Sequence, residues 1–194
     1  MNVGSTLYVI NRKQWRSWLV KHHRSEPEIW LIYYKKDSGK PRIPYNDAVE
    51  EALCYGWIDS TLKPRDELSY VQRFSPRRKN SQLSEMNKER VRQLIKTKKM
   101  TRFGLDSIQH HMENGSKYSK RSAMPKKFKM PEDILNELKK HPVAWKNFQK
   151  FPESYKRIRI GWIDGSRNRP DFFAIRLRYF IKMTEKNKMF GMVR

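Results

Sequence analysis

Two short segments of the sequence hold residue types that could bind an anion. Trp57 and Asp59 lie two residues apart in a segment expected to be a strand, which points both side chains to the same face. Downstream, Arg73 and Arg77 flank a segment of extended character, and guanidinium groups pair bidentately with phosphate or carboxylate. The hypothesis is a concave ligand site. Its candidate ligand-binding residues are Trp57, Asp59, Ser60, Arg73, Arg77, Arg78, Ser81 and Asn87.

Two other interpretations of these residues stay open. Asp59 could form a structural ion pair with Arg73 or Arg77, with Trp57 packed in the core. Alternatively, Asp59 could serve as the general base of an enzyme and Arg77 as its anion stabiliser. No activated nucleophile or cofactor motif accompanies them, so catalytic residues are unassigned and the enzyme interpretation ranks last.

The cysteine and histidine residues do not predict redox or metal chemistry. Cys54 is the one cysteine and cannot form an internal disulfide; beside Leu53, on the inner face of an expected helix, it is typical of a small hydrophobic residue. The five histidines include two adjacent pairs, which point to different helix faces and do not chelate as i, i+4 pairs do. A phosphate-cradling glycine motif is absent from the sequence as well. We therefore expect no metal and no cofactor.

Charge is the strongest feature of the composition. Forty-three Lys and Arg residues oppose 20 Asp and Glu residues, which leaves a net charge of +23. Such an excess attracts polyanions, with nucleic acid, acidic membrane surfaces and phosphorylated ligands as the main candidates. The basic segments Arg77–Lys79, Lys96–Lys99 and Lys117–Lys129 could follow a phosphate backbone, with Tyr118 and Phe128 available for stacking. The alternative is that these segments are solvated helix ends and a linker.

The elements that must hold the candidate residues alternate in type along residues 1–113. The predicted segments are a helix from Asn11 to His22, a strand over Glu28–Lys36, a helix capped by Asn46 and ended by Gly56, strands over Trp57–Asp59 and Leu68–Phe74, and helices capped by Ser84 and Thr101. Helices and strands joined by short turns predict a small mixed domain of the α+β class.

The second half of the chain has a different character. Residues 114–130 are rich in Lys and Arg and show no apolar period, which predicts a basic linker. Residues 131–194 are expected to form a small helical domain, with helices beginning near Pro131, Pro142, Pro152 and Pro170.

Several motifs occur in an order and spacing typical of one family. They are Trp30–Lys36, Tyr45, Ala48–Ser60, Arg73–Arg78, Ser81, Asn87 and Met100–Gly104. Over residues 5–112 this pattern resembles the N-terminal signature of YdeI-type proteins. The helices with Pro131–Asp133 and Tyr155–Ile163 resemble the OmpD-associated segment of the same family. The chain departs from the family pattern at Leu83, where a tryptophan is usual, and at the interruption by Asp164–Ser166 and Pro170.

The resemblance implies a bacterial or archaeal cytosolic protein linked to resistance against bacteriocins or antimicrobial peptides, without a defined reaction. A protein of charge +23 should repel cationic peptides, so such protection would be indirect. Residues 1–10 lack the features of a signal peptide, and no stretch approaches the ~20 apolar residues that span a bilayer. We therefore expect a cytoplasmic protein without a transmembrane segment, whose oligomeric state the sequence leaves open.

The function expected first is binding of a small anionic or phosphorylated ligand in a stress response. The alternatives are nucleic-acid binding through the basic surface and an enzyme that uses Asp59 and Arg77.

Overall fold

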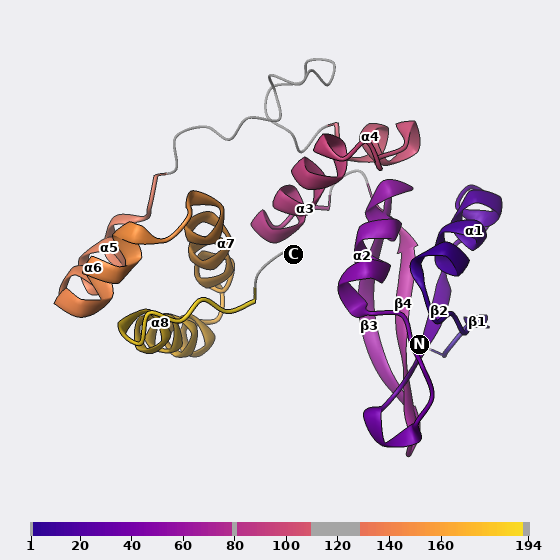
Figure 1. Cartoon of the computed structure of the whole chain (residues 1–194), viewed down its shortest axis with the longest axis horizontal. Coiled ribbons are helices and arrows are strands. Elements are labelled where there is room, and N and C mark those ends of the chain that lie inside the picture. The colour runs from indigo at the N-terminus through magenta and orange to yellow at the C-terminus, as the bar shows by residue number, and fades with distance from the viewer. Residues whose placement is uncertain (1, 79–80, 110–128, 192–194) are drawn as a thin grey trace. The chain divides into compact units, whose positions relative to one another are not determined.

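The computed structural model of the chain describes residues 2–78, 81–109 and 129–191 (Figure 1). The chain divides into two compact units, the first comprising residues 1–82 and 91–123 and the second residues 83–90 and 124–194. The predicted linker over 114–130 lies almost entirely outside the described residues. The N-terminal part holds a sheet and the C-terminal part holds helices, which confirms the α+β class.

The N-terminal unit is built on a four-stranded mixed sheet of order β1-β2-β4-β3. Strand β1 runs parallel to β2, whereas β4 pairs antiparallel with both β2 and β3. The strands are β1 (Thr6–Leu7), β2 (Ile29–Tyr34), β3 (Trp57–Asp66) and β4 (Ser69–Pro76). Strand β1 was not predicted, because two residues are too few to show an alternating pattern.

Strands β3 and β4 form a hairpin that is longer than the two short strands predicted there. At its turn, the Leu68 amide donates to the Asp66 carboxylate over 2.9 Å. A register shift between Asp59 and Leu62 interrupts the alternation along β3. Pro64 is tolerated because β3 is an edge strand of this sheet and does not need every amide for pairing.

Side-chain caps set the starts of three helices, as predicted. Asn11 accepts from the Gln14 amide at 3.0 Å, Ser84 from the Asn87 amide at 3.3 Å and Thr101 from the Gly104 amide at 3.3 Å. The helices of the first half of the chain are α1 (Arg12–His22), α2 (Tyr45–Cys54), α3 (Glu85–Lys96) and α4 (Arg102–Ile108), with a 3-10 turn η1 (Lys36–Ser38) after β2.

The cap predicted for α2 at Asn46 is wrong. The helix begins at Tyr45. Pro44, two residues before Asn46, occupies the cap position without a side-chain hydrogen bond. The other end was predicted correctly: Gly56 adopts φ +76, the left-handed conformation that commonly terminates helices.

Helices α1 and α2 pack on one face of the sheet. The Trp15 ring lies 5.5 Å from that of Phe74, and Trp18 lies 5.6 Å from Trp57, both in edge contact. Trp15 Nε1 also donates to the Ala48 carbonyl at 3.0 Å, which joins the two helices. The fully buried tryptophan residues explain how a strongly polar chain still forms a core.

The opposite sheet face carries a smaller apolar cluster of Trp30, Ile32 and Val71, with Tyr34 against it. A long cationic side chain covers part of this cluster, because Lys63 Nζ lies 5.6 Å from the centre of the Trp30 ring. The alkyl part of lysine can shield apolar surface in this way while its charge stays in water.

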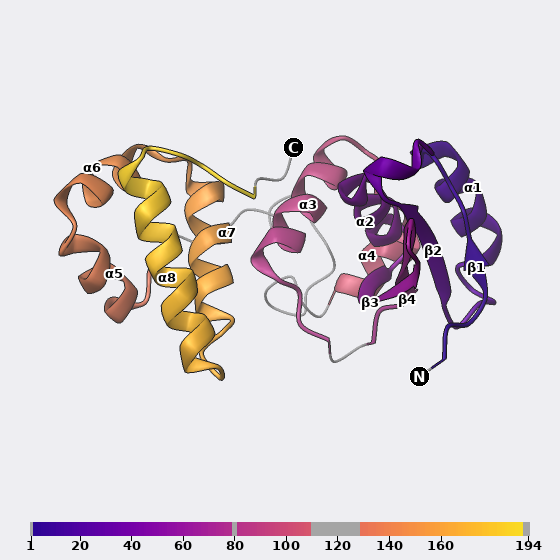
Figure 2. The same ribbon diagram turned by 90° about the horizontal axis from the view of Figure 1, so that it is seen from below.

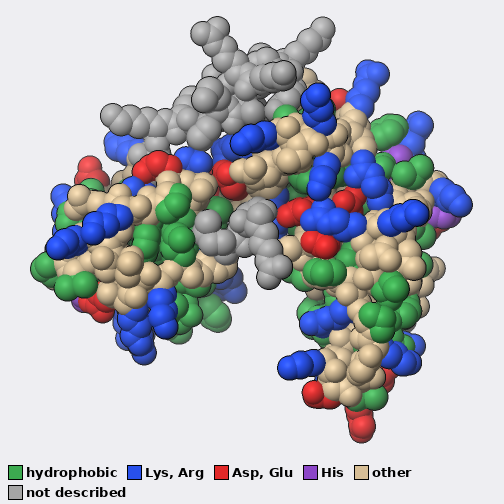
Figure 3. Space-filling model, viewed as in Figure 1, with side chains coloured by type: hydrophobic (Ala, Val, Ile, Leu, Met, Phe, Trp, Pro, Cys, Tyr) green, Lys and Arg blue, Asp and Glu red, His purple; other side chains and the backbone are tan. Residues whose placement is uncertain are grey.

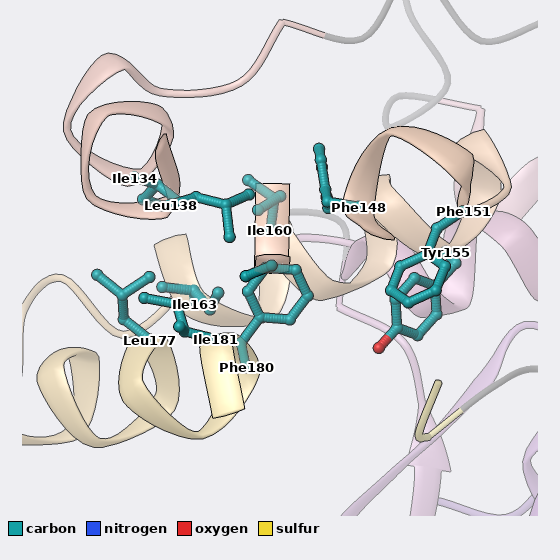
Figure 4. Packing of buried hydrophobic residues seen from close by; sticks show 11 residues of the cluster. Ile134, Leu138, Phe148, Phe151, Tyr155, Ile160, Ile163, Leu177, Phe180 and Ile181 are labelled. Carbon is teal, nitrogen blue, oxygen red and sulfur yellow. The ribbon is translucent and has the colours of Figure 1, made fainter. Parts of the chain in front are cut away.

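Residues 129–191, the described C-terminal part of the second unit and here called the C-terminal unit, form four helices with their own core (Figures 2 and 4). They are α5 (Glu132–Lys139), α6 (Pro142–Lys150), α7 (Glu153–Asp164) and α8 (Pro170–Glu185). Pro142 and Pro170 occupy the first helical turn as predicted, whereas Pro131 and Pro152 sit one residue before their helices. Within the described ranges, no helix has both the length and the apolar character needed to cross a membrane.

Candidate functional site

The predicted ligand cluster is divided among several places in the structure. Trp57 is 1% exposed, and its Nε1 donates to the His23 carbonyl at 3.0 Å. Its ring packs against Trp18 within the core. The structure thus places Trp57 as a packing residue, as in the structural interpretation of this segment.

The pairing register separates Asp59 from Arg73. Asp59 lies opposite Phe74 of β4, and the neighbouring residue Arg73 points to the other sheet face. There Arg73 binds Glu28, with Nε and Nη2 each 2.6 Å from the same carboxylate oxygen, and its Nη1 donates to Ser60 Oγ at 3.3 Å. Arg73 and Ser60 are therefore together, but around Glu28.

Asp59 instead accepts a hydrogen bond of 2.6 Å from the hydroxyl of Tyr45, the first residue of α2. On the same sheet face, Tyr33 and Tyr70 stack at 5.3 Å, and Arg42 Nη1 donates to the Tyr70 hydroxyl at 3.0 Å. Among the residues that the structure describes, Asp59 forms no ion pair. Its hydrogen-bond partner is Tyr45, which the sequence analysis placed in a family motif but not among the ligand-binding residues.

Arg77 lies in the loop that follows β4 and is 8% exposed. Its Nη1 donates to Ser81 Oγ at 2.9 Å and to the carbonyls of Ser81 and Gln82 at 3.3 and 3.2 Å. Burial lowers the pKa of the Arg77 guanidinium, and the charge of Asp59 acts in the opposite direction. Arg77 and Ser81 are brought together as predicted, but the contacts fasten a loop.

Arg78 belongs to the same loop, where its carbonyl accepts from Ser81 Oγ at 2.8 Å, whereas Asn87 lies in α3. Arg78 is exposed, and Asn87 accepts from Arg90 Nη1 at 2.8 Å within the first half of α3. Residues 83–90 belong to the second compact unit, whereas Arg77 belongs to the first.

Cys54 is fully buried where α2 meets α4. Burial raises the pKa of its thiol to about 11, which leaves the thiolate scarce at neutral pH. Its carbonyl accepts hydrogen bonds from the amide and the hydroxyl of Thr101. The expectation of a packing cysteine is confirmed.

A groove that the sequence did not reveal runs between α1 and the segment Leu7–Val9. Its volume is about 470 Å³. Its charged lining residues are Lys13, Lys21 and, when protonated, His22, and no carboxylate lies among the lining residues. Lys13 and Lys21 are exposed and two i, i+4 steps apart, so both follow one side of α1.

Aromatic rings line the same groove. Trp18 is half-buried and stacks on Trp15 at 5.3 Å, and the His22 ring lies 4.9 Å from it. Because Trp15 and Trp57 hold the Trp18 ring from the core side, the ring is fixed before any ligand arrives. A fixed ring loses little entropy on stacking with a ligand.

Tyr8 connects this groove with the sheet face that carries Tyr34. It lines the groove, and its ring meets the Tyr34 ring edge-on at 5.1 Å. Lys40 Nζ lies 4.6 Å above the Tyr34 ring, and a hydrogen bond from Arg65 lowers the pKa of the Tyr34 hydroxyl. We call this surface the basic–aromatic strip; it consists of Tyr8, Lys13, Trp18, Lys21, His22, Tyr34, Lys40 and Arg65.

Positive charge alone would not have located the strip. Figure 3 shows Lys and Arg side chains over both units in that view, with acidic side chains among them. Near α1, for example, Arg12 pairs with Asp47, Glu50 and Glu51 of α2 and is neutralised there. A sequence signal did exist in the lysine spacing of α1, but Tyr34, Lys40 and Arg65 are far from it along the chain.

Comparison with known families places both halves of the chain. A family model described as a domain of unknown function (DUF8412) matches residues 7–107, slightly more than half of the chain. The chain therefore belongs to this family. A second model, described as Bacteriocin-protection, YdeI or OmpD-Associated (OmdA), matches residues 127–187 and confirms the suspected relationship. No curated protein and no solved structure matches the chain.

The sequence analysis related both halves of the chain to one family, whereas the two halves match two different family models. The YdeI and OmpD-associated description applies to the C-terminal helices, whereas the N-terminal motifs between Trp30 and Gly104 fall within the first match. Neither description states a ligand or a reaction.

Proposed function

We propose that the N-terminal unit binds single-stranded nucleic acid along the basic–aromatic strip. The observation that carries this proposal is the groove beside α1. Its lining combines two exposed lysines with aromatic rings and includes no carboxylate, and Tyr8 continues it to Tyr34 beneath Lys40.

The chemistry of the strip suits a single strand. Proteins bind single strands by stacking bases on aromatic rings while cations follow the phosphate backbone. Unpaired bases can reach rings at the surface, whereas the bases of a duplex are read by elements that enter a groove. Carboxylates would repel the backbone, and the groove has none among its lining residues. Phosphate contacts release counterions, so the affinity must fall steeply with salt.

Binding of a small anionic or phosphorylated ligand near Arg77 is a weaker proposal. Arg77 Nη1 already donates to three oxygen atoms of its own loop, and the residue is only 8% exposed, so a ligand has little access to the guanidinium. An enzyme that uses Asp59 and Arg77 has less support, because the Asp59 carboxylate already accepts a hydrogen bond from Tyr45.

A role in bacteriocin protection, which the OmdA description names, would then act through nucleic acid. A chain of charge +23 would repel cationic peptides rather than sequester them. We also propose a cytoplasmic place of action, which the buried free thiol of Cys54 supports, since free thiols persist in reducing compartments.

The test is a fluorescence anisotropy titration of the full chain with labelled single-stranded RNA and with duplex DNA of equal length. We expect the single strand to bind more tightly at physiological salt. In the variant Tyr34→Leu the affinity should fall roughly tenfold, because stacking contributes about 1–3 kcal/mol per base. Tyr34→Phe keeps the ring and should stay near the wild type. Equal affinity for both nucleic acids, or an unchanged affinity in Tyr34→Leu, would contradict the proposal.

A further inference from the structure

The C-terminal unit has a groove of its own, between α5 and α8. Its volume is about 620 Å³. The apolar floor consists of Phe173, Ala174, Leu177 and Ile181, all from α8. This volume and this apolar lining are typical of sites for small molecules.

Each carboxylate of the groove has a partner within the unit, and for Asp133 and Glu137 this partner is a cation. Asp133 accepts two hydrogen bonds of 2.9 Å from the guanidinium of Arg167. Glu137 pairs with Lys140 at 2.7 Å, and Glu185 lies 3.0 Å from His141 Nδ1. These partners leave the acidic side of the groove with little attraction for a further cation.

The cations of α8 are not balanced in the same way. Arg178 and Lys182 line the groove, are exposed, and form no ion pair with any residue in the described part of the chain. They are four residues apart on one helix, where like charges repel each other. An anion between them would relieve that repulsion, and the apolar floor lies directly beside them.

We propose that this groove binds a small amphiphilic anion, with its apolar body on the floor and its head group between Arg178 and Lys182. The charge arrangement carries this choice, because the acids have partners of their own, whereas Arg178 and Lys182 form no ion pair within the described residues. The head group would be a single carboxylate, sulfonate or phosphate. This binding is independent of the proposed nucleic-acid function, which uses residues of the N-terminal unit.

The experiment compares decanoate with decyltrimethylammonium, which share an apolar chain and differ in the sign of the head group. Each is titrated, below the concentration at which it forms micelles, into isotopically labelled full chain, and NMR signals are followed residue by residue. We expect decanoate to shift the signals of Ala174, Leu177 and Ile181. The cationic probe should bind far more weakly.

Two variants test the contributions of the two cations and of the apolar floor separately. Arg178→Gln with Lys182→Gln should weaken decanoate binding roughly fivefold, since exposed charge contacts are individually modest. Ala174→Glu places a carboxylate at an exposed floor position and should abolish binding without disturbing the core. The matched control Lys146→Gln with Lys150→Gln removes two exposed charges of α6 that do not line the groove, and should bind decanoate like the wild type.

Several results would overturn the proposal. The first is equal binding of the two probes, the second is signal changes spread over the molecule, and the third is undiminished decanoate binding by both groove variants. Failure of decanoate to bind the wild type at all would also contradict it.

Discussion

The two units treat their charged side chains differently. In the N-terminal unit, Lys13 and Lys21 stand beside aromatic rings in a groove without carboxylates. In the C-terminal unit, the groove holds carboxylates with partners of their own beside the cations Arg178 and Lys182 over an apolar floor. The number of charges therefore says less about binding than the pairing of each charge.

The same distinction holds within the N-terminal unit. Arg12 and Arg73 are bound by carboxylates of the unit and serve packing and register. Lys13, the direct neighbour of Arg12, is exposed and lines the groove. Adjacent positions of one helix thus have separate roles, which a count of basic residues cannot distinguish.

The largest expected effect tests whether the two units have separate cores. Gly104 of α4 lies so close to α2 that a Cβ atom there would collide with the backbone carbonyl of Cys54. Gly104→Ala should therefore lower the free energy of unfolding of the N-terminal unit by about 2 kcal/mol, although alanine favours helices. Denaturant unfolding, followed by NMR signals of each unit, measures it.

The C-terminal unit should keep its unfolding midpoint in Gly104→Ala. Asp106→Ala serves as the control on the same helix, since its ion pair with Arg102 is long and exposed. An equal loss of stability in both units would show that the cores are not separate.

A smaller effect tests the claim that paired charges are structural. Trp30 Nε1 and Arg73 both donate to the Glu28 carboxylate, and these hydrogen bonds hold its pKa below the usual value. Glu28→Gln should lower the free energy of unfolding at neutral pH by about 1 kcal/mol. The comparison with Glu67→Gln, an exposed residue of the hairpin turn, controls for the loss of one negative charge.

The stability difference between wild type and Glu28→Gln should depend on pH. A carboxylate whose pKa is lowered by folding stabilises the protein above its unfolded pKa of about 4.3, and this stability is lost as the pH falls through the folded value. The difference between wild type and Glu28→Gln should therefore close in acid. A difference that stays constant with pH would indicate that Glu28 acts through packing instead.

Local signals in the sequence predicted most elements of the fold. Asn11, Ser84 and Thr101 cap their helices because a side-chain cap depends on the next three residues alone. The failure at Asn46 shifts the cap by two residues, to Pro44, and the failures at Pro131 and Pro152 shift a helix start by one residue. In each case a proline occupies the cap position.

The site was harder to predict because it depends on pairing between distant segments. Trp57 and Asp59 do share a sheet face, but the register of β4 turns Arg73 to the other face and towards Glu28. The strip joins Tyr8, Lys21 and Lys40 through contacts that only the folded chain creates. Spacing along one segment could not have placed them together.

The most direct test of the central claim is the salt dependence of single-stranded RNA binding in Lys13→Gln with Lys21→Gln. Each lost phosphate contact should reduce the slope of log affinity against log salt by about 0.7, so the double variant should lose about 1.4. The matched control Lys146→Gln with Lys150→Gln removes the same charge from the C-terminal unit and should keep the wild-type slope. Equal slopes for the two double variants would contradict the assignment of the groove beside α1 as the nucleic-acid site.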